Sequence, residues 1–286
     1  MCRSHDKIQT ILLKEVKEYL VNVSKLYEQN PHGPDVLTPS LPTSSLKQPI
    51  NSAEYLLPPV IVWDPLLQFP NIFCHQFYCS KDSHSTCCVP LIPKRWKNGL
   101  SEKDAPRKLY GKNCTVLLVS RVYVCCKGHE IIAHDPCIVD KIVPENVPFY
   151  LSHKSGVTLD LANTINSLAN TGLTFTEIGR HVAQEYYNCH WLKEGRFRNN
   201  TKYFHEQNDS ISNKDTTEPF PDCREWVELP SDDIIIGCFI LHFEENKVFY
   251  TERMSDLSAV YLSMDHTFKV AANIGVRLPD NKWVTQ

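Results

Sequence analysis

Long apolar segments are missing from this chain of 286 residues, and their absence excludes two classes of protein. No window approaches the roughly 18 consecutive apolar residues of a membrane-spanning helix. The first twenty residues carry charged side chains such as Lys7, Lys14 and Glu18, so they lack the apolar stretch of a secretory signal. We therefore expect a protein that does not cross a membrane and is not secreted.

A large excess of charge of one sign is also missing, because 33 Asp and Glu and 30 Lys and Arg give a net charge of -3. This balance excludes a uniformly basic nucleic-acid-binding protein. The charges are separated along the chain, however. Residues 90–130 hold nine bases and three acids, a balance of +6, and residues 215–256 hold eleven acids and three bases, a balance of -8. We expect the basic middle to attract DNA and the acidic region to be a surface for a protein partner.

The hydrophobic pattern predicts an α+β protein with several domains. Apolar residues recur at helical spacing over 8–28 and 155–190, and β-branched runs at 60–63 and 116–119 indicate strands. Seven prolines between residues 30 and 59 indicate a linker, because proline lacks the amide donor of a regular ladder. The expected order is an N-terminal helix (1–29), a proline-rich linker (30–59), a cysteine-rich domain (60–150), a helical segment (151–204), an acidic linker (205–230) and a C-terminal region (231–286).

A cluster of cysteine and histidine residues predicts a structural zinc site. Eight of the twelve cysteines fall between Cys74 and Cys137, and without a secretory signal we expect free thiols or metal ligands in place of disulfides. Two short-spaced pairs joined by a longer excursion supply the four ligands of a zinc-ribbon-like site. The expected ligands are Cys74, Cys79, Cys126 and His129. The alternative ligands are Cys87, Cys88, Cys125 and His75, and buried free thiols are the alternative to a metal site.

Residues 156–190 predict two helices joined by a short turn, as in a DNA-binding helix–turn–helix. A helical stripe is interrupted at 170–173, and Thr174 and Glu177 then form a capping box that begins the second helix. The side chains expected to face inward on the two helices are Leu161, Ile165, Leu168, Ile178, Val182 and Tyr186. An ordinary helical hairpin is the alternative.

Polar and basic side chains near this hairpin are the expected DNA contacts. On the second helix, Thr176, Arg180 and Gln184 face outward, and Arg and Gln can pair with guanine and adenine edges. The stretch after it, 191–203, mixes basic and aromatic residues, and a solvated basic loop is the alternative reading of that stretch. Phosphate contacts are expected from Arg107, Lys108 and Arg121 in the basic middle and from Arg196 and Arg198 in this stretch.

The apolar run 259–264 predicts a strand that ends in Asp265. Alone, this aspartate is typical of a turn or a cap. The surrounding sequence, Ser263-Met-Asp265-His-Thr-Phe-Lys-Val270, resembles the start of the catalytic domain in transposase-like proteins of eukaryotic DNA transposons. Upstream, Val62-Trp-Asp-Pro65, Arg121-Val-Tyr-Val-Cys125 and His134-Asp-Pro136 resemble the cysteine-rich domain of unknown function that precedes it. The resemblance covers roughly residues 60–286.

The resemblance implies zinc in the cysteine-rich part, double-stranded DNA as the ligand and a nuclear location, with the cytoplasm as the alternative. It implies that 231–286 is the incomplete start of an RNase H-like domain and that Asp265 is the first of three catalytic acids. Magnesium is expected only with a complete catalytic domain. We therefore expect zinc-dependent DNA binding without cleavage, and homo-oligomers are compatible with this. The alternatives are a zinc-stabilised protein-interaction module, an active nuclease and an inactive transposon remnant.

Overall fold

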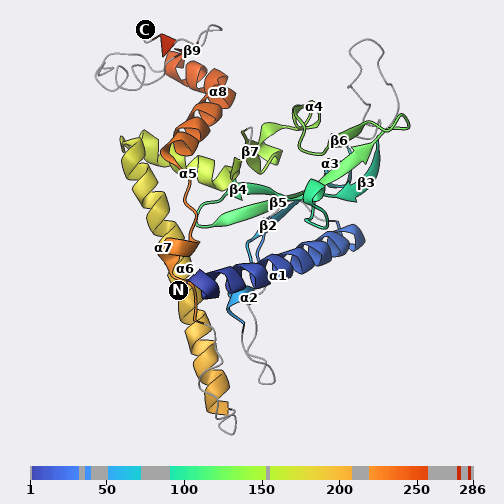
Figure 1. Ribbon diagram of the computed structural model, residues 1–286. Helices are drawn as coiled ribbons and strands as arrows, with labels where there is room; N and C mark the ends of the chain where they lie inside the picture. Colours follow the sequence, from blue (N-terminus) through green and yellow to red (C-terminus); the bar gives the residue numbers. More distant parts are fainter. Residues whose placement is uncertain are drawn as a thin grey trace. The chain divides into compact units, whose positions relative to one another are not determined.

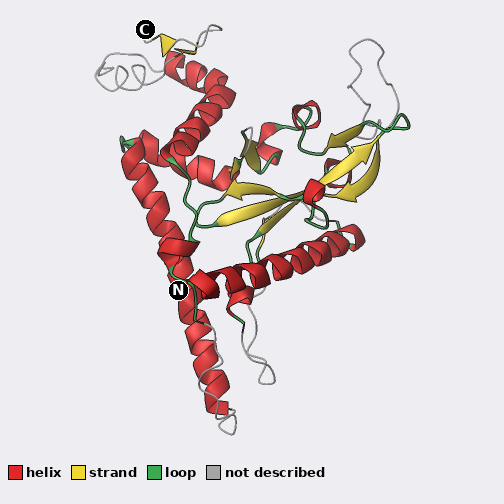
Figure 2. Ribbon diagram, viewed as in Figure 1, coloured by secondary structure: helices red, strands yellow, loops and turns green. Residues whose placement is uncertain are grey.

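The computed structural model describes residues 2–31, 36–39, 51–71, 91–152, 155–207, 219–256, 276–277 and 283–284. The fold is a mixture of helices and a curled sheet, which confirms the α+β class (Figures 1 and 2). The helices are α1 (Cys2–Gln29), α2 (Ser52–Leu56), α3 (Pro65–Gln68), α4 (Pro136–Val139), α5 (Leu159–Asn170), α6 (Phe175–Gln207), α7 (Cys223–Trp226) and α8 (Asp232–Asp256), with 3-10 turns at Glu102–Asp104 and Pro144–Asn146. The strands are β1 (Val36–Leu37), β2 (Val60–Trp63), β3 (Ile92–Trp96), β4 (Arg107–Tyr110), β5 (Thr115–Val124), β6 (Glu130–Ile132), β7 (Phe149–Leu151), β8 (Gly156–Thr158), β9 (Val276–Arg277) and β10 (Trp283–Val284).

The ten-residue strand β5 organises the sheet. Its first half pairs in parallel with β2 and antiparallel with β4, and its second half pairs antiparallel with β3 and β6. The continuous path through the sheet runs β1-β2-β5-β4-β8-β7. Strand β5 is long enough to serve two sets of neighbours because it is rich in valine and leucine, which suit a pleated surface. The strands expected at 60–63 and at 116–119 are both present.

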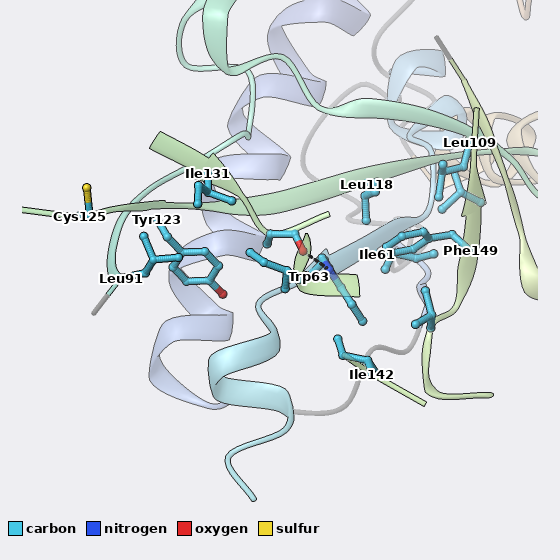
Figure 3. Packing of buried hydrophobic residues seen from close by; sticks show 14 residues of the cluster. Ile61, Trp63, Leu91, Leu109, Leu118, Tyr123, Cys125, Ile131, Ile142 and Phe149 are labelled. Carbon is cyan, nitrogen blue, oxygen red and sulfur yellow. Dashed lines mark hydrogen bonds between the residues drawn. The ribbon is translucent and has the colours of Figure 1, made fainter. Parts of the chain in front are cut away.

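Strand β2 is buried on both faces, and its side chains alternate between two cores. Val60 and Val62 pack with Leu20 and Tyr27 of α1. Ile61 and Trp63 belong to the core on the other face, where Trp63 Nε1 donates a hydrogen bond of 2.9 Å to the carbonyl of Ala133 (Figure 3). Helix α1 therefore covers one face of the sheet, which confirms the helix expected over 8–28.

The proline-rich linker expected over 30–59 is wrong where it can be compared with the structure. Strand β1 pairs with β2, and α2 buries Ala53, Tyr55 and Leu56. The backbone carbonyl of Pro59 also accepts a 2.9 Å hydrogen bond from the amide of Leu117. Proline removes a donor but keeps its acceptor, so prolines can flank short packed elements without making them a linker.

Helices α5, α6 and α8 form a second core beside the sheet. Leu161 and Ile165 of α5 pack with Ile178 and Val182 of α6 and with Ile235 of α8. The acidic linker expected over 205–230 is wrong for its described part. Helix α6 continues to Gln207, Val227 and Leu229 pack against this core, and Phe220 lies against His190 and Phe197.

The C-terminal region divides within α8, since the chain forms two compact units, 1–242 and 243–286. The second unit contains the end of α8 and the antiparallel pair β9–β10. The strand expected over 259–264 lies outside the described residues, as does Asp265. None of the helices in the described part of the chain is long and apolar enough to cross a membrane.

Candidate nucleic-acid interface

Arg121, one of the expected DNA contacts, is held inside the fold. Its side chain is only 14% exposed and lies over the ring of Trp96, with 4.6 Å from the guanidinium carbon to the ring centroid. It contacts Glu28 Oε1 at 2.5 Å and lies 3.8 Å from Asp64 Oδ2. Asp64 is fully buried, and burial raises the pKa of its carboxyl group. Arg121 is therefore the internal counter-ion of this carboxylate.

Arg107 and Lys108 are also occupied by partners within the fold. Arg107 donates to the carbonyls of Ser152 and Ser155, and burial lowers its pKa. Lys108 forms an ion pair with Glu228, which the sequence places in the acidic region more than a hundred residues away. Glu28, Asp64 and Glu228 lie outside residues 90–130, so these three acids offset half of the +6 balance. We leave Arg107, Lys108 and Arg121 out of the candidate interface.

Two other bases of the basic middle pair with acids of the same stretch, which the +6 balance already counts. Arg95 lies 2.6 Å from Glu130 and 2.7 Å from Asp104, and Lys94 lies 2.8 Å from Glu130. The hydrogen bond from Arg95, followed by that from Lys94, lowers the pKa of Glu130 to about 2. These ion pairs join β3 to β6 and to the 3-10 turn, so their first role is structural.

The turn between α5 and α6 forms as the sequence predicts. Gly172 has a φ of +87°, the left-handed conformation that ends a helix at low cost. The Thr174 amide and hydroxyl each donate to Glu177 Oε2 at 2.8 Å, and the Glu177 amide donates to Thr174 Oγ1 at 3.3 Å. The capping box is therefore confirmed, and the same hydrogen bonds lower the pKa of Glu177.

One face of α6 is buried, and the opposite face is exposed. Ile178, Val182 and Tyr186 are at most 3% exposed, as expected. Six exposed residues on the opposite face follow helical steps of four and seven residues and form what we call the α6 stripe: Thr176, Arg180, Gln184, Trp191, Arg198 and Lys202. Trp191 is 50% exposed and stacks on Tyr187.

Arg196, another expected DNA contact, does not belong to the α6 stripe. Residues 191–203 are helical, so the basic loop weighed as an alternative is wrong, and Arg196 lies about 160° around the helix axis from Arg198. Arg196 lines a cavity with Lys193 and Cys189. The sequence analysis missed this separation because it did not assign residues 193–202 to a helix with two faces.

Two of the basic residues of the α6 stripe, Arg198 and Lys202, have weak partners of their own. Arg198 lies 2.5 Å from Glu194, and Lys202 lies 3.8 Å from Glu206. In both exposed pairs the two residues are one helical turn apart. Each such pair stabilises a helix by a few tenths of a kcal/mol, so a phosphate group can replace either carboxylate. Gln184 Nε2 donates to Asn188 at 2.9 Å, another exposed contact that a ligand can replace.

Two of the four expected zinc ligands lie in the turn between β5 and β6. Cys126 is exposed, and the turn closes through hydrogen bonds from the Cys125 amide to the His129 carbonyl and from the Gly128 amide to the Cys125 carbonyl. Cys74 and Cys79 lie outside the described residues. Within the part of the chain that the structure describes, no group of three or more His, Cys, Asp or Glu is placed to hold a metal ion.

The described part of segment 215–256 uses some of its acids internally. Glu228 pairs with Lys108, and Asp222 accepts a hydrogen bond of 2.8 Å from the Arg224 amide as the cap of α7.

The sequence did not indicate that Cys114 and Cys189 meet in space. Their separation of 75 residues follows no motif, so only the fold reveals the pair.

Comparison of the chain with protein-family models, with curated proteins and with solved structures finds no match. The resemblance to transposase-like proteins therefore stays a prediction.

Proposed function

We propose that this chain binds double-stranded DNA through the α6 stripe. The observation that carries the proposal is the position of Arg180, Arg198 and Lys202 on one exposed face of a helix whose opposite face is buried. A short turn and a capping box begin this helix, as in helix–turn–helix proteins, where the second helix enters the major groove.

The length of α6 separates the stripe into two roles. Helix α6 has 33 residues and is about 50 Å long. The DNA backbone winds around the duplex, so it stays close to a straight protein helix over only part of that length. The first half, with Thr176, Arg180 and Gln184, supplies the side chains that pair with guanine and adenine edges. Arg198 and Lys202, in the second half, supply phosphate contacts, which set affinity but not sequence preference.

We further propose that structural zinc stabilises the β5–β6 turn. Cys126 and His129 would supply two ligands, and Cys74 and Cys79, or their neighbours Cys87 and Cys88, the other two. The described fold supports this in one respect. Segment 72–90 holds Cys74 and Cys79, and Ile92 follows it by two residues. Ile92 pairs with Val124, which lies two residues before Cys126, so the strand after this segment begins beside the β5–β6 turn. Zinc here would cross-link two chain segments and take no part in a reaction.

The test is a titration of the full chain into labelled duplex DNA at about 50 and 200 mM salt. The stripe variant carries Arg180→Gln, Arg198→Gln and Lys202→Gln. The matched control carries Lys17→Gln, Lys25→Gln and Arg196→Gln, so both variants lose three positive charges. We expect wild type and control to bind with similar affinity, and the stripe variant to bind at least tenfold more weakly at the lower salt.

Two outcomes would contradict the proposal. Equal losses in both variants would mean that net charge, and not the stripe, determines binding. No binding by the wild-type chain would leave the stripe as a solvated face and would favour the protein-interaction alternative. A zinc chelator in a parallel titration tests the metal separately, because the proposed zinc lies in the sheet and the stripe on α6. We expect the chelator to lower the stability of the β5–β6 turn.

A further inference from the structure

Cys114 lies in the turn between β4 and β5, and this turn is fixed to α6. The Gly111 amide donates to the Cys114 carbonyl at 2.9 Å and closes the turn. The Tyr186 hydroxyl donates to the Gly111 carbonyl at 3.0 Å and ties the turn to α6. Cys189 follows Tyr186 by three residues, on the same side of the helix. Two rigid elements therefore bring the two cysteines together.

The two cysteines line the same space. Both are free cysteines, and each shifts the pKa of the other. Both line two adjoining cavities of about 110 Å³ and about 290 Å³. Lys193 also lines both cavities, and Arg196 lines the larger one. A small molecule that enters either cavity lies against both cysteines and Lys193.

The surroundings make the two sulfurs unequal. The hydrogen bond from Cys114, followed by the charges of Lys193 and Arg196, lowers the pKa of the Cys189 thiol to about 6. The same hydrogen bond, followed by burial, raises the pKa of the Cys114 thiol. The charged groups around the pair are Lys193, Arg196 and Glu185 of α6, Asp160 of α5, Glu54 of α2 and Glu228 after α7. Lys193 and Arg196 both favour the thiolate form of Cys189.

We propose that Cys114 and Cys189 form a redox-active dithiol site that exchanges with small disulfides. In this site Cys189 attacks and Cys114 resolves. The reaction does not depend on the proposed DNA binding, because both sulfurs lie on the side of α6 opposite to the stripe.

The exchange has two balanced steps. The Cys189 thiolate attacks one sulfur of a disulfide R–S–S–R, so the Cys189–S–R bond forms and R–S⁻ leaves. The thiolate charge at Cys189 then no longer exists, and the main cause of the raised pKa at Cys114 is removed. Cys114 gives its proton to the departing R–S⁻ and attacks the Cys189 sulfur. The Cys114–Cys189 disulfide forms and the second R–S⁻ leaves to take a proton from water. Two protein thiols are oxidised and one small disulfide is reduced to two thiols.

The expected rate advantage of Cys189 grows as the pH falls. With a pKa of about 6, half of Cys189 is thiolate at pH 6, against well under 1% of an ordinary cysteine. Lower basicity reduces the intrinsic nucleophilicity of the thiolate and offsets part of this gain. The net advantage over an ordinary cysteine is about tenfold at pH 6 and about twofold at pH 7. Cys223 of α7, which is also partly exposed, serves as the reference cysteine within the same chain.

The test treats the reduced full chain with cystamine at pH 6 and pH 7. Samples are quenched with acid, alkylated and mapped by peptide mass. In the wild type we expect a Cys114–Cys189 linked peptide. In Cys114→Ser the cystamine adduct should persist on Cys189, because the resolving thiol is absent. In Cys189→Ser neither product should form, and Cys223 should react at an unchanged rate.

Circular dichroism identifies a variant that does not fold, and Cys114→Ala then replaces Cys114→Ser. Two results would overturn the proposal. One is an adduct on Cys189 that forms no faster than the adduct on Cys223 at pH 6. The other is a wild-type disulfide that joins Cys189 to a cysteine other than Cys114.

Discussion

The basic side chains of the sheet and those of α6 look alike in sequence but have different roles in the fold. Arg107, Lys108 and Arg121 belong to a stretch with a balance of +6, and each is held by carbonyls or carboxylates from distant parts of the chain. Arg180 and Arg198 belong to a less charged stretch, and both are exposed. Charge counted along a sequence window therefore overstates the surface charge of a sheet, where partners arrive from other strands and helices.

Removing Arg121 should have the largest effect of any single change in this comparison. Arg121→Ala leaves the buried carboxylate of Asp64 without its counter-ion and removes the contacts to Glu28 and Trp96. We expect a loss of about 4 kcal/mol in the free energy of unfolding. Urea denaturation measures it, with the exposed Arg180→Ala as the control, which should change stability by less than about 0.5 kcal/mol. Equal effects at the two positions would contradict the distinction between sheet and helix.

Acid should destabilise the sheet through His134. Burial, followed by the charges of Arg107 and Lys97, lowers the pKa of His134 to about 4 from 6.5. The unfolded chain therefore binds more protons between these values. The contribution of neutral His134 to the free energy of unfolding is fully present above pH 6.5 and is lost as the pH falls toward 4. The total loss from this group is roughly 3 kcal/mol.

Stability measured against pH in His134→Gln checks this prediction. The slope between pH 6.5 and 4 should be smaller than in the wild type. A wild-type slope that survives His134→Gln would show that another group titrates in this range.

Losing the capping box should have a smaller effect that is confined to α6. Thr174→Ala removes the hydroxyl that accepts the Glu177 amide, so the first turn of the helix loses about 1 kcal/mol. Amide hydrogen exchange should show faster exchange in residues 175–178 and unchanged exchange in β5. Uniform acceleration throughout the chain would mean that the hairpin and the sheet unfold together.

The parts of the fold that the sequence predicted are those with a long repeat or a local motif. The helix at 8–28, the strands at 60–63 and 116–119 and the capping box at Thr174 depend on neighbouring residues, and all are present. The two linkers were wrong because Tyr55 and Leu56 are buried, and Phe220 packs on Phe197, through elements far away in sequence. The ion pair of Lys108 with Glu228 and the meeting of Cys114 with Cys189 have no local signal. The zinc ligands Cys74 and Cys79, and Asp265, lie outside the described residues and stay predictions.

The salt dependence of DNA binding in Arg198→Ala and Arg196→Ala tests the central claim most directly. The two residues are two positions apart on α6, have the same side chain and lie on opposite sides of the helix. If the stripe contacts phosphates, Arg198→Ala should reduce the slope of log affinity against log salt by about 0.9, and Arg196→Ala should leave it unchanged. Equal slopes in the two variants, whether both are reduced or neither is, would contradict the proposal that the α6 stripe is the DNA-binding surface.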